Sequence, residues 1–148
     1  MSQYNRSFKL ELVTPHGRVA TMDVYSVIFP ASDGQVGVLA GRAPVAAIVG
    51  AGGLAAETTD GKHLDYFVAG GFANMTGDHL TILAEQCAPV EDIDREQAWN
   101  DLEAARKLPF GQRRDVAVEI ARARFDLVQR YLSRTGQLAG DARGRDLD

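Results

Sequence analysis

The side chains that could perform chemistry are few, and their spacing matches no catalytic motif. Cys87 is the only cysteine, so neither an internal disulfide nor a paired-cysteine zinc site can form. His16, His63 and His79 are too scattered for a ligand spacing such as HExxH. No combination of nucleophile, base and orienting group emerges. The sequence therefore predicts a protein that is not an enzyme and that holds neither a metal nor a cofactor.

Two glycine-rich stretches could be mistaken for nucleotide-binding loops. "GAGGLA", from Gly50 to Ala55, fits G-x-G-x-x-A, but the turn signal Asp60-Gly61 leaves no room for the helix that a dinucleotide site needs. Gly70-Gly71 lacks the Lys-Ser/Thr of a P-loop, which favours a kink or bulge in a sheet. A small nucleotide-binding enzyme remains a minor alternative.

Composition and charge narrow the class of protein. The 148 residues are 45% hydrophobic with a net charge of −4, which argues against nucleic acid as the main partner. No apolar run approaches the ~20 residues of a membrane span, and no signal-peptide core is visible, so we expect a cytosolic chain. Residues 106–134 carry eight basic and three acidic groups. This excess indicates either a docking face for an acidic partner or a solvated helix face.

Residues 1–88 are typical of a β domain. "FKLELVT", "VYSVIFP", "LDYFVAG" and "HLTILAE" are short segments rich in alternating, β-branched or aromatic residues. Asp60-Gly61 and Gly77-Asp78 lie between such segments, as hairpin turns do. We therefore predict an antiparallel β-sandwich or barrel here.

Residues 89–132 are predicted to form an antiparallel two-helix hairpin, which makes the whole chain mainly β plus α. The first helix is capped by Asp92 or Asp94, and its apolar face contains Ala98, Leu102 and Ala105. The second helix, capped by Asp115, has an expected apolar stripe of Val116, Ile120, Ala123, Leu127 and Tyr131. Residues 133–148 are rich in glycine and charge, and we expect a flexible tail.

Three stretches resemble one family. They are "DGQVGVLAGRAPV", "YFVAGGFANMTGDHLTILAE" and "EDIDREQAWNDLEAARK", and the likeness covers about residues 7–132 in order. The chain resembles the epsilon subunit of the bacterial rotary F-type ATP synthase, the counterpart of the mitochondrial delta subunit. The resemblance implies a β-sandwich followed by a helical hairpin, in agreement with the interpretation from the residues alone.

The resemblance also implies a role. Such a subunit lies in the central rotor stalk of the proton-translocating enzyme, at the cytoplasmic face of the inner membrane, and reaches the membrane only through the complex. The β-sandwich would contact the gamma subunit and the loops of the c ring, coupling ring rotation to the catalytic hexamer. The hairpin would fold back or extend toward the catalytic alpha and beta subunits and could inhibit ATP hydrolysis.

By the same resemblance, the loop "DGQVGVLAGRAPV" is a contact element. Its tip around Asp33 and Gln35 would face the c-ring loops, and Arg42 would lie toward gamma. The family often has an acidic residue where Gln35 stands, so a charge pair at that position is not expected. A plain structural turn remains the alternative interpretation.

In the hairpin, the resemblance assigns basic residues to an acidic segment of the beta subunits; they are Arg113, Arg114, Arg122, Arg124 and Arg130. Some members bind ATP through Ile/Leu-Asp-x-x-Arg-Ala and two later arginines. Here Ile93 and Asp94 match and Arg122 can fill one later position, but Gln97 and Asp126 replace the other two arginines. Because phosphate binding depends on such cations, we expect poor ATP binding or none. An unrelated β-sandwich adaptor with a helical arm remains the alternative to the rotor role.

Overall fold

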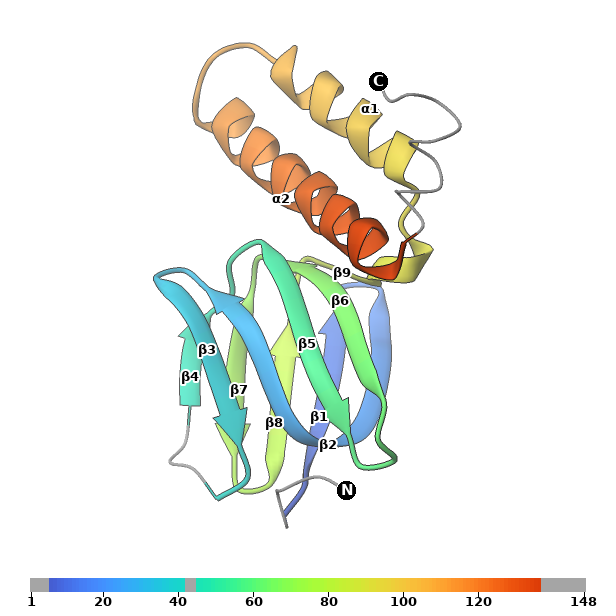
Figure 1. The fold of residues 1–148 in the computed structure, drawn as a ribbon. Coiled ribbons are helices and arrows are strands. Elements are labelled where there is room, and N and C mark those ends of the chain that lie inside the picture. The colour runs from blue at the N-terminus through green and yellow to red at the C-terminus, as the bar shows by residue number, and fades with distance from the viewer. Residues whose placement is uncertain (1–5, 42–44, 137–148) are drawn as a thin grey trace. The chain divides into compact units, whose positions relative to one another are not determined.

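The computed structural model describes residues 6–41 and 45–136 of the chain. These residues form two compact units: the first ends at Pro89 and the second begins at Val90. The predicted order of a β-sandwich followed by two helices is confirmed (Figure 1).

The first unit is built from nine strands within the described residues, and Figure 1 shows them as two facing layers. The order across the sheet is β4-β7-β8-β1-β2-β5-β6-β9, and β3 pairs with β2. Neighbouring strands are antiparallel except β1 and β8, which pair in parallel. The strands are β1 (Phe8–Thr14), β2 (Gly17–Ala31), β3 (Gly34–Leu39), β4 (Val45–Ile48), β5 (Gly52–Thr58), β6 (His63–Ala69), β7 (Phe72–Thr76), β8 (His79–Leu83) and β9 (Gln86–Pro89).

Strand β2 belongs to both layers. It has 15 residues, and its first half pairs with β1 while its second half pairs with β3 and β5. The register with β5 shifts between Val24 and Ser26, an irregularity of the kind that lets a strand bend. The two inner faces bury one hydrophobic core that includes Leu10, Leu12, Val27, Phe29, Leu54, Met75, Leu80 and Ile82.

"GAGGLA" is part of this sheet. Gly52 begins strand β5, which runs on to Thr58 and hydrogen-bonds to β2 and β6. No helix follows the glycines, because the chain turns at Asp60-Gly61 into β6. The prediction of a turn and a small-residue strand is therefore confirmed, and a dinucleotide fingerprint is excluded at this position.

The second unit contains a short 3-10 helix, η1 (Val90–Asp92), and two α-helices, α1 (Arg95–Arg106) and α2 (Gln112–Thr135). Asp94 is the N-cap of α1, since its carboxylate accepts a hydrogen bond of 2.9 Å from the backbone N–H of Gln97. The prediction that Asp115 caps α2 is wrong. The helix begins at Gln112, and Asp115 lies in its first turn, where a negative charge is also favourable.

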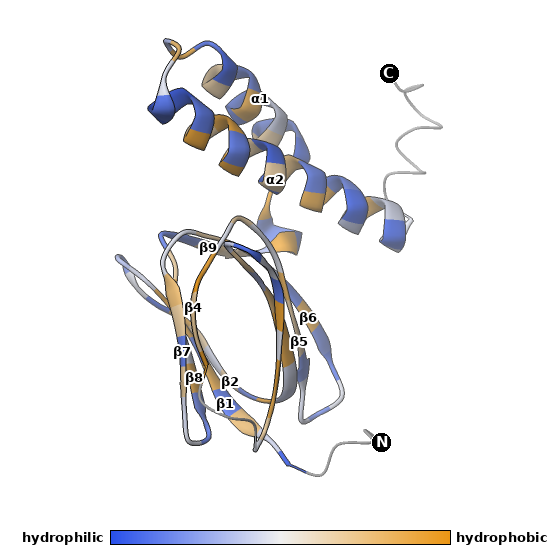
Figure 2. Cartoon of the chain, turned by 90° about the vertical axis from the view of Figure 1, so that its left-hand side faces the viewer, coloured by the Kyte–Doolittle hydropathy of each residue, from blue (hydrophilic) through white to orange (hydrophobic). Residues whose placement is uncertain are grey.

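The contact between α1 and α2 is built from small residues. Leu102, Ala105 and Ala121 are buried there, with Ala117 and Phe125 packed against them. The expected face of α1 is confirmed, because Ala98, like Leu102 and Ala105, is buried. The expected stripe of α2 is displaced by about one position, since Val116 is 48% exposed while Ala121 and Val128 are buried. Alanine permits the closest approach of two helices, and Figure 2 shows apolar and polar residues alternating along α2.

Among the residues that the structure describes, no helix is long and apolar enough to cross a membrane. The expected tail falls mostly outside those residues, because the description ends at Gly136, which caps α2 in a left-handed conformation.

Candidate functional site

The surroundings of Cys87 and of the histidine and acidic side chains show how these groups can react. Burial raises the pKa of the Cys87 thiol to about 11, so this side chain stays protonated near neutral pH and is a poor nucleophile. Within residues 6–41 and 45–136, no group of three or more histidine, cysteine or acidic residues could hold a metal ion. The surface of the β unit offers the clearest candidate for a site.

Four apolar side chains form a line across the outer face of one layer. Ile48 on β4 is the cross-strand partner of Phe72 on β7, Phe72 of Leu83 on β8, and Leu83 of Val13 on β1. Ile48 is 65% exposed, Phe72 55% and Leu83 39%, and Val13 is half-buried. Because side chains alternate along a strand, the residues beside them point into the core. We call these four residues the apolar row.

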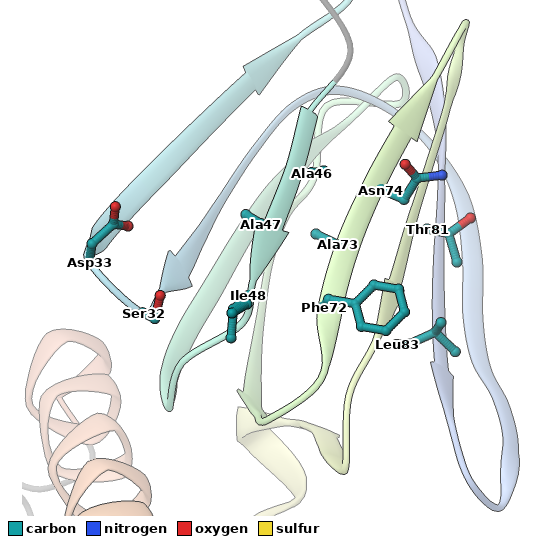
Figure 3. Close-up of a pocket in the computed structure, with 10 residues that line it drawn as sticks. All are labelled: Ser32, Asp33, Ala46, Ala47, Ile48, Phe72, Ala73, Asn74, Thr81 and Leu83. Atoms are coloured by element: carbon teal, nitrogen blue, oxygen red, sulfur yellow. The ribbon is translucent and has the colours of Figure 1, made fainter.

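A shallow groove of about 770 Å³ lies along the apolar row (Figure 3). Phe72 and Leu83 line it, together with Ile48 and Asp33, which comes from the turn between β2 and β3. A second hollow of about 240 Å³ shares Phe72 and Leu83 and is bordered by Glu85. An exposed apolar patch with a polar rim is typical of a protein-binding surface.

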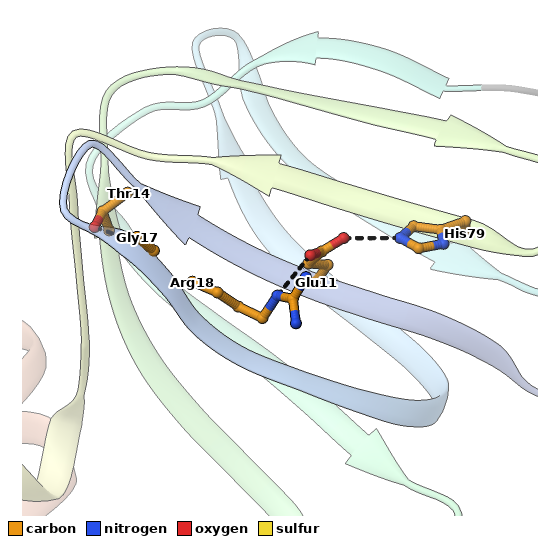
Figure 4. A network of polar contacts seen from close by, with 5 residues as sticks. All are labelled: Glu11, Thr14, Gly17, Arg18 and His79. Carbon is orange, nitrogen blue, oxygen red and sulfur yellow. Dashed lines mark hydrogen bonds and ion pairs between the residues drawn. The ribbon is translucent and has the colours of Figure 1, made fainter.

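A polar network lies beside the apolar row, because Glu11 stands two residues before Val13 on β1 (Figure 4 shows the network). Glu11 on β1 accepts a hydrogen bond of 2.8 Å from Arg18 Nε, and its second oxygen lies 3.0 Å from Nε2 of His79. The hydrogen bond with His79, assisted by the charge of Arg18, lowers the pKa of the Glu11 carboxyl. This side of the surface is therefore ordered by partners within the β unit itself.

The Gly70-Gly71 turn aligns the strands that carry the apolar row. Gly71 has φ +101°, and a Cβ there would lie 1.8 Å from the carbonyl oxygen of Leu83. Its own carbonyl accepts a hydrogen bond of 3.0 Å from Val49 N, and Gly70 O accepts one of 3.3 Å from Glu85 N. The turn ties the ends of β4, β7 and β8 together. The sequence-based expectation of a kink rather than a phosphate loop agrees with this geometry.

The predicted contact loop is only partly described. Asp33 and Gln35 are both exposed, at the turn between β2 and β3 and at the start of β3. Gly34 has φ +134°, and Ser32 N donates a hydrogen bond of 2.9 Å to Ile48 O, which fixes the turn beside β4. Arg42 lies outside the described residues. The structure thus brings Asp33 next to the apolar row, an arrangement that the sequence did not predict.

The five arginines predicted to bind a partner fall into two groups. Arg113, Arg122 and Arg130 are exposed on α2. Arg114 stacks over the Phe110 ring at 5.1 Å, and Arg124 pairs with Asp101 at 3.4 Å, so both also stabilise the hairpin.

The three candidates for an ATP site are also placed. Ile93 is half-buried, and Asp94 already serves as the cap of α1. Gln97, at the position of the missing arginine, donates its side-chain N–H to Asp101 at 2.9 Å. Arg122 is exposed on α2.

The apolar row was missed by sequence reasoning, although a weak signal was present. Ile48-Val49 and Ile82-Leu83 are adjacent apolar pairs within or next to strands, and only one member of each pair can face the core. The outward members, Ile48 and Leu83, have apolar neighbours in the row that come from other strands. A pattern within one segment therefore does not show that they form a row.

Comparisons with known proteins agree with one another. Residues 7–90 match the family model described as the β-sandwich domain of the ATP synthase delta/epsilon chain. A protein of Rhizobium etli named ATP synthase epsilon chain is 36% identical over 101 residues, which cover 68% of this chain and 75% of that one. A protein of Brucella anthropi with the same name is 36% identical over 102 residues, covering 69% and 76%.

Two solved structures are similar. One is a chain of the Euglena gracilis mitochondrial ATP synthase, from a structure of OSCP, F1 and c-ring, with a TM-score of 0.71, 26% identity, and coverage of 88% of this chain and 84% of that chain. The other is a chain of the Tetrahymena thermophila central stalk and c-ring, with a TM-score of 0.57, 13% identity, and coverage of 87% and 98%. The second likeness concerns the fold alone.

Proposed function

Because this chain belongs to the family of ATP synthase delta/epsilon chains, whose members are non-catalytic subunits, we propose that it couples rotation of the c ring to the catalytic hexamer through gamma. The observation that supports this proposal best is the apolar row on an otherwise polar sheet face. A binding partner with a complementary apolar surface would cover Ile48, Phe72 and Leu83 and shield them from water, and gamma would be that partner.

The β unit suits a part that transmits torque. Its core is continuous between the two layers, and the Gly70-Gly71 turn fixes the strands of the apolar row against one another. A surface that is rigid before binding loses little conformational entropy on docking. The turn between β2 and β3 would then contact the loops of the c ring at Gln35, while Asp33 lines the groove along the apolar row.

The docking of gamma can be tested by association of the full-length chain with a gamma-containing catalytic complex. Phe72→Asp should weaken binding by about 30- to 100-fold, since it places a charge in the centre of the buried surface. Ile28→Asp is the matched control, because Ile28 is 46% exposed on β2 but lies outside the apolar row. Equal binding by the Phe72→Asp variant and the wild type would refute the assignment.

The hairpin is proposed to inhibit ATP hydrolysis. The support is the exposure of Arg113, Arg122 and Arg130 on one helix, where they can approach an acidic segment of the catalytic subunits. A chain ending at Pro89 retains the whole core of the β unit. It should still join the complex and should raise ATP hydrolysis; unchanged hydrolysis would show that the hairpin is not inhibitory.

Two further parts of the proposal concern ATP binding by the hairpin and the location of the chain in the cell. With Gln97 bonded to Asp101 and Asp94 used as a cap, we expect no ATP sensing by the hairpin, and micromolar ATP binding in calorimetry would contradict this. The chain would lie at the cytoplasmic face of the inner membrane, held there by gamma and the c ring. Loss of the chain from washed membranes that lack gamma is the expected result.

A further inference from the structure

The spacing of the apolar row matches one kind of binding partner. Its members lie on adjacent strands, which are about 4.8 Å apart, so the row advances by that distance at each step. One turn of an α-helix rises about 5.4 Å, a mismatch of about 0.6 Å per step. Side chains on one face of a β-strand repeat at about 6.8 Å, a mismatch of about 2 Å per step. A helix therefore follows the row, whereas a strand does not.

The orientation of such a helix follows from the polar residues beside the row. On each of these strands, a polar residue lies two positions from the member of the row. These residues are Asn74 on β7, Thr81 on β8 and Glu11 on β1. A helix that ran parallel to the strands would contact the apolar row over only about one turn, and its next turn would lie on these polar groups. A helix that crosses the strands keeps an apolar contact at every turn.

The charges around the groove indicate the charge of the partner. Asp33 lines the groove near β4, and Glu85 borders the smaller hollow beyond Leu83 (Figure 3 shows Asp33). Both are exposed, and neither has an ion pair within the described part of the chain. Glu11, by contrast, is paired with Arg18 and His79. Two exposed carboxylates that form no ion pair with residues 6–41 or 45–136 favour a basic partner.

We propose that the apolar row receives an amphipathic helix of gamma that lies across β4, β7, β8 and β1. Its apolar residues follow the spacing i, i+4, i+7, i+11, and Lys or Arg side chains flank them beside Asp33 and Glu85. This inference rests on the proposed docking of gamma and adds the conformation, direction and charge of the segment that docks.

Site-specific photocrosslinking tests the conformation. Ile48, Phe72 and Leu83 are replaced one at a time by p-benzoylphenylalanine in the full-length chain, which is then bound to a gamma-containing catalytic complex without the c ring. The expected crosslinks fall on one segment of gamma and advance by three or four residues per step. Crosslinks that advance by two residues, or that scatter over several segments, overturn the inference while leaving the docking of gamma intact. Failure of the unmodified chain to bind overturns the docking itself, and this inference with it.

A charge-matched pair of variants tests the chemistry. The double variant Asp33→Asn/Glu85→Gln should bind the same complex about tenfold more weakly at low salt, and the difference should shrink as salt screens the charges. Glu57→Gln/Asp78→Asn removes the same charge at a half-buried and an exposed position of the β unit away from the row and should change binding less than twofold. Because the complex lacks the c ring, an effect at Asp33 reports on gamma alone. Identical binding by the two double variants refutes the basic helix.

Discussion

Among the glycines that the structure describes, Gly71 is the one at which an added Cβ would come nearest to another atom, so Gly71→Ala should be strongly destabilising. The new Cβ would lie 1.8 Å from Leu83 O and 2.7 Å from Leu83 C, so the end of β8 has to move. The residue also has φ +101°, a conformation that L side chains rarely adopt. A left-handed conformation costs about 1–2 kcal/mol and overpacking about 1–3 kcal/mol, which together give a loss of about 2–5 kcal/mol.

Two other glycines separate these contributions. Gly77 has φ +60°, and a methyl group added there would meet nothing within 4 Å, so Gly77→Ala should lose only about 1 kcal/mol. Gly37 lies in β3 with open space and no positive φ, so Gly37→Ala should be neutral or stabilising by about 0.5 kcal/mol.

The assay is urea unfolding of the full-length chain, with hydrogen exchange of peptides from the β unit as the readout. At about 2 kcal/mol per M of urea, the midpoint for Gly71→Ala should fall by about 1–2.5 M, against about 0.5 M for Gly77→Ala. Equal midpoints for the two variants would refute the argument from the Leu83 carbonyl. A folded Gly71→Ala variant should also bind gamma more weakly, because the strands of the apolar row would no longer be aligned.

Three further outcomes are expected. The His79 hydrogen bond lowers the pKa of Glu11 below 4.5, so its contribution to stability is present above about pH 4.5 and is lost as pH falls through the folded-state pKa. Glu11→Gln should therefore flatten the acid side of a plot of urea midpoint against pH, and curves of equal slope would contradict this. The Cys87 thiol, with a pKa of about 11 against 9.0 for the ordinary group, should react with a thiolate-selective reagent about 100-fold more slowly in the folded chain than in urea, and similar rates would show that it is not protected. Asp94→Ala should destabilise the hairpin by about 1 kcal/mol through loss of the cap, whereas Asp92→Ala, in η1, should have little effect; thermal unfolding followed by circular dichroism compares the two, and equal losses would contradict the assignment of the cap.

Much of the fold was predictable because it depends on neighbours in the sequence. Alternating residues such as Phe8, Leu10 and Leu12 specify a strand with one buried face, and all three are buried. Asp94 was one of two predicted caps, and the backbone N–H of Gln97 lies within its reach. The second helix was predicted less well, since its apolar residues cover two adjacent stripes and only the approach of α1 selects the alanines of one stripe.

The candidate site depends on contacts that no local pattern encodes. Val13, Ile48, Phe72 and Leu83 are spread over 71 residues of the chain and become neighbours only through the parallel pairing of β1 with β8 and the antiparallel pairing of β4 with β7. The same holds for Asp33, which reaches the groove because its turn is bonded to Ile48.

The sequence alone therefore predicted the order of strands and helices, several turns, the cap of α1 as one of two residues, and the family resemblance. All of these rest on interactions between residues close in the chain or on motifs within one segment. Tertiary structure decided which apolar side chains stay on the surface and which of them adjoin. The physical reason is that alternation along a strand requires one side chain of each adjacent pair to face outward. The register between strands determines which side chains of other strands lie beside that outward side chain.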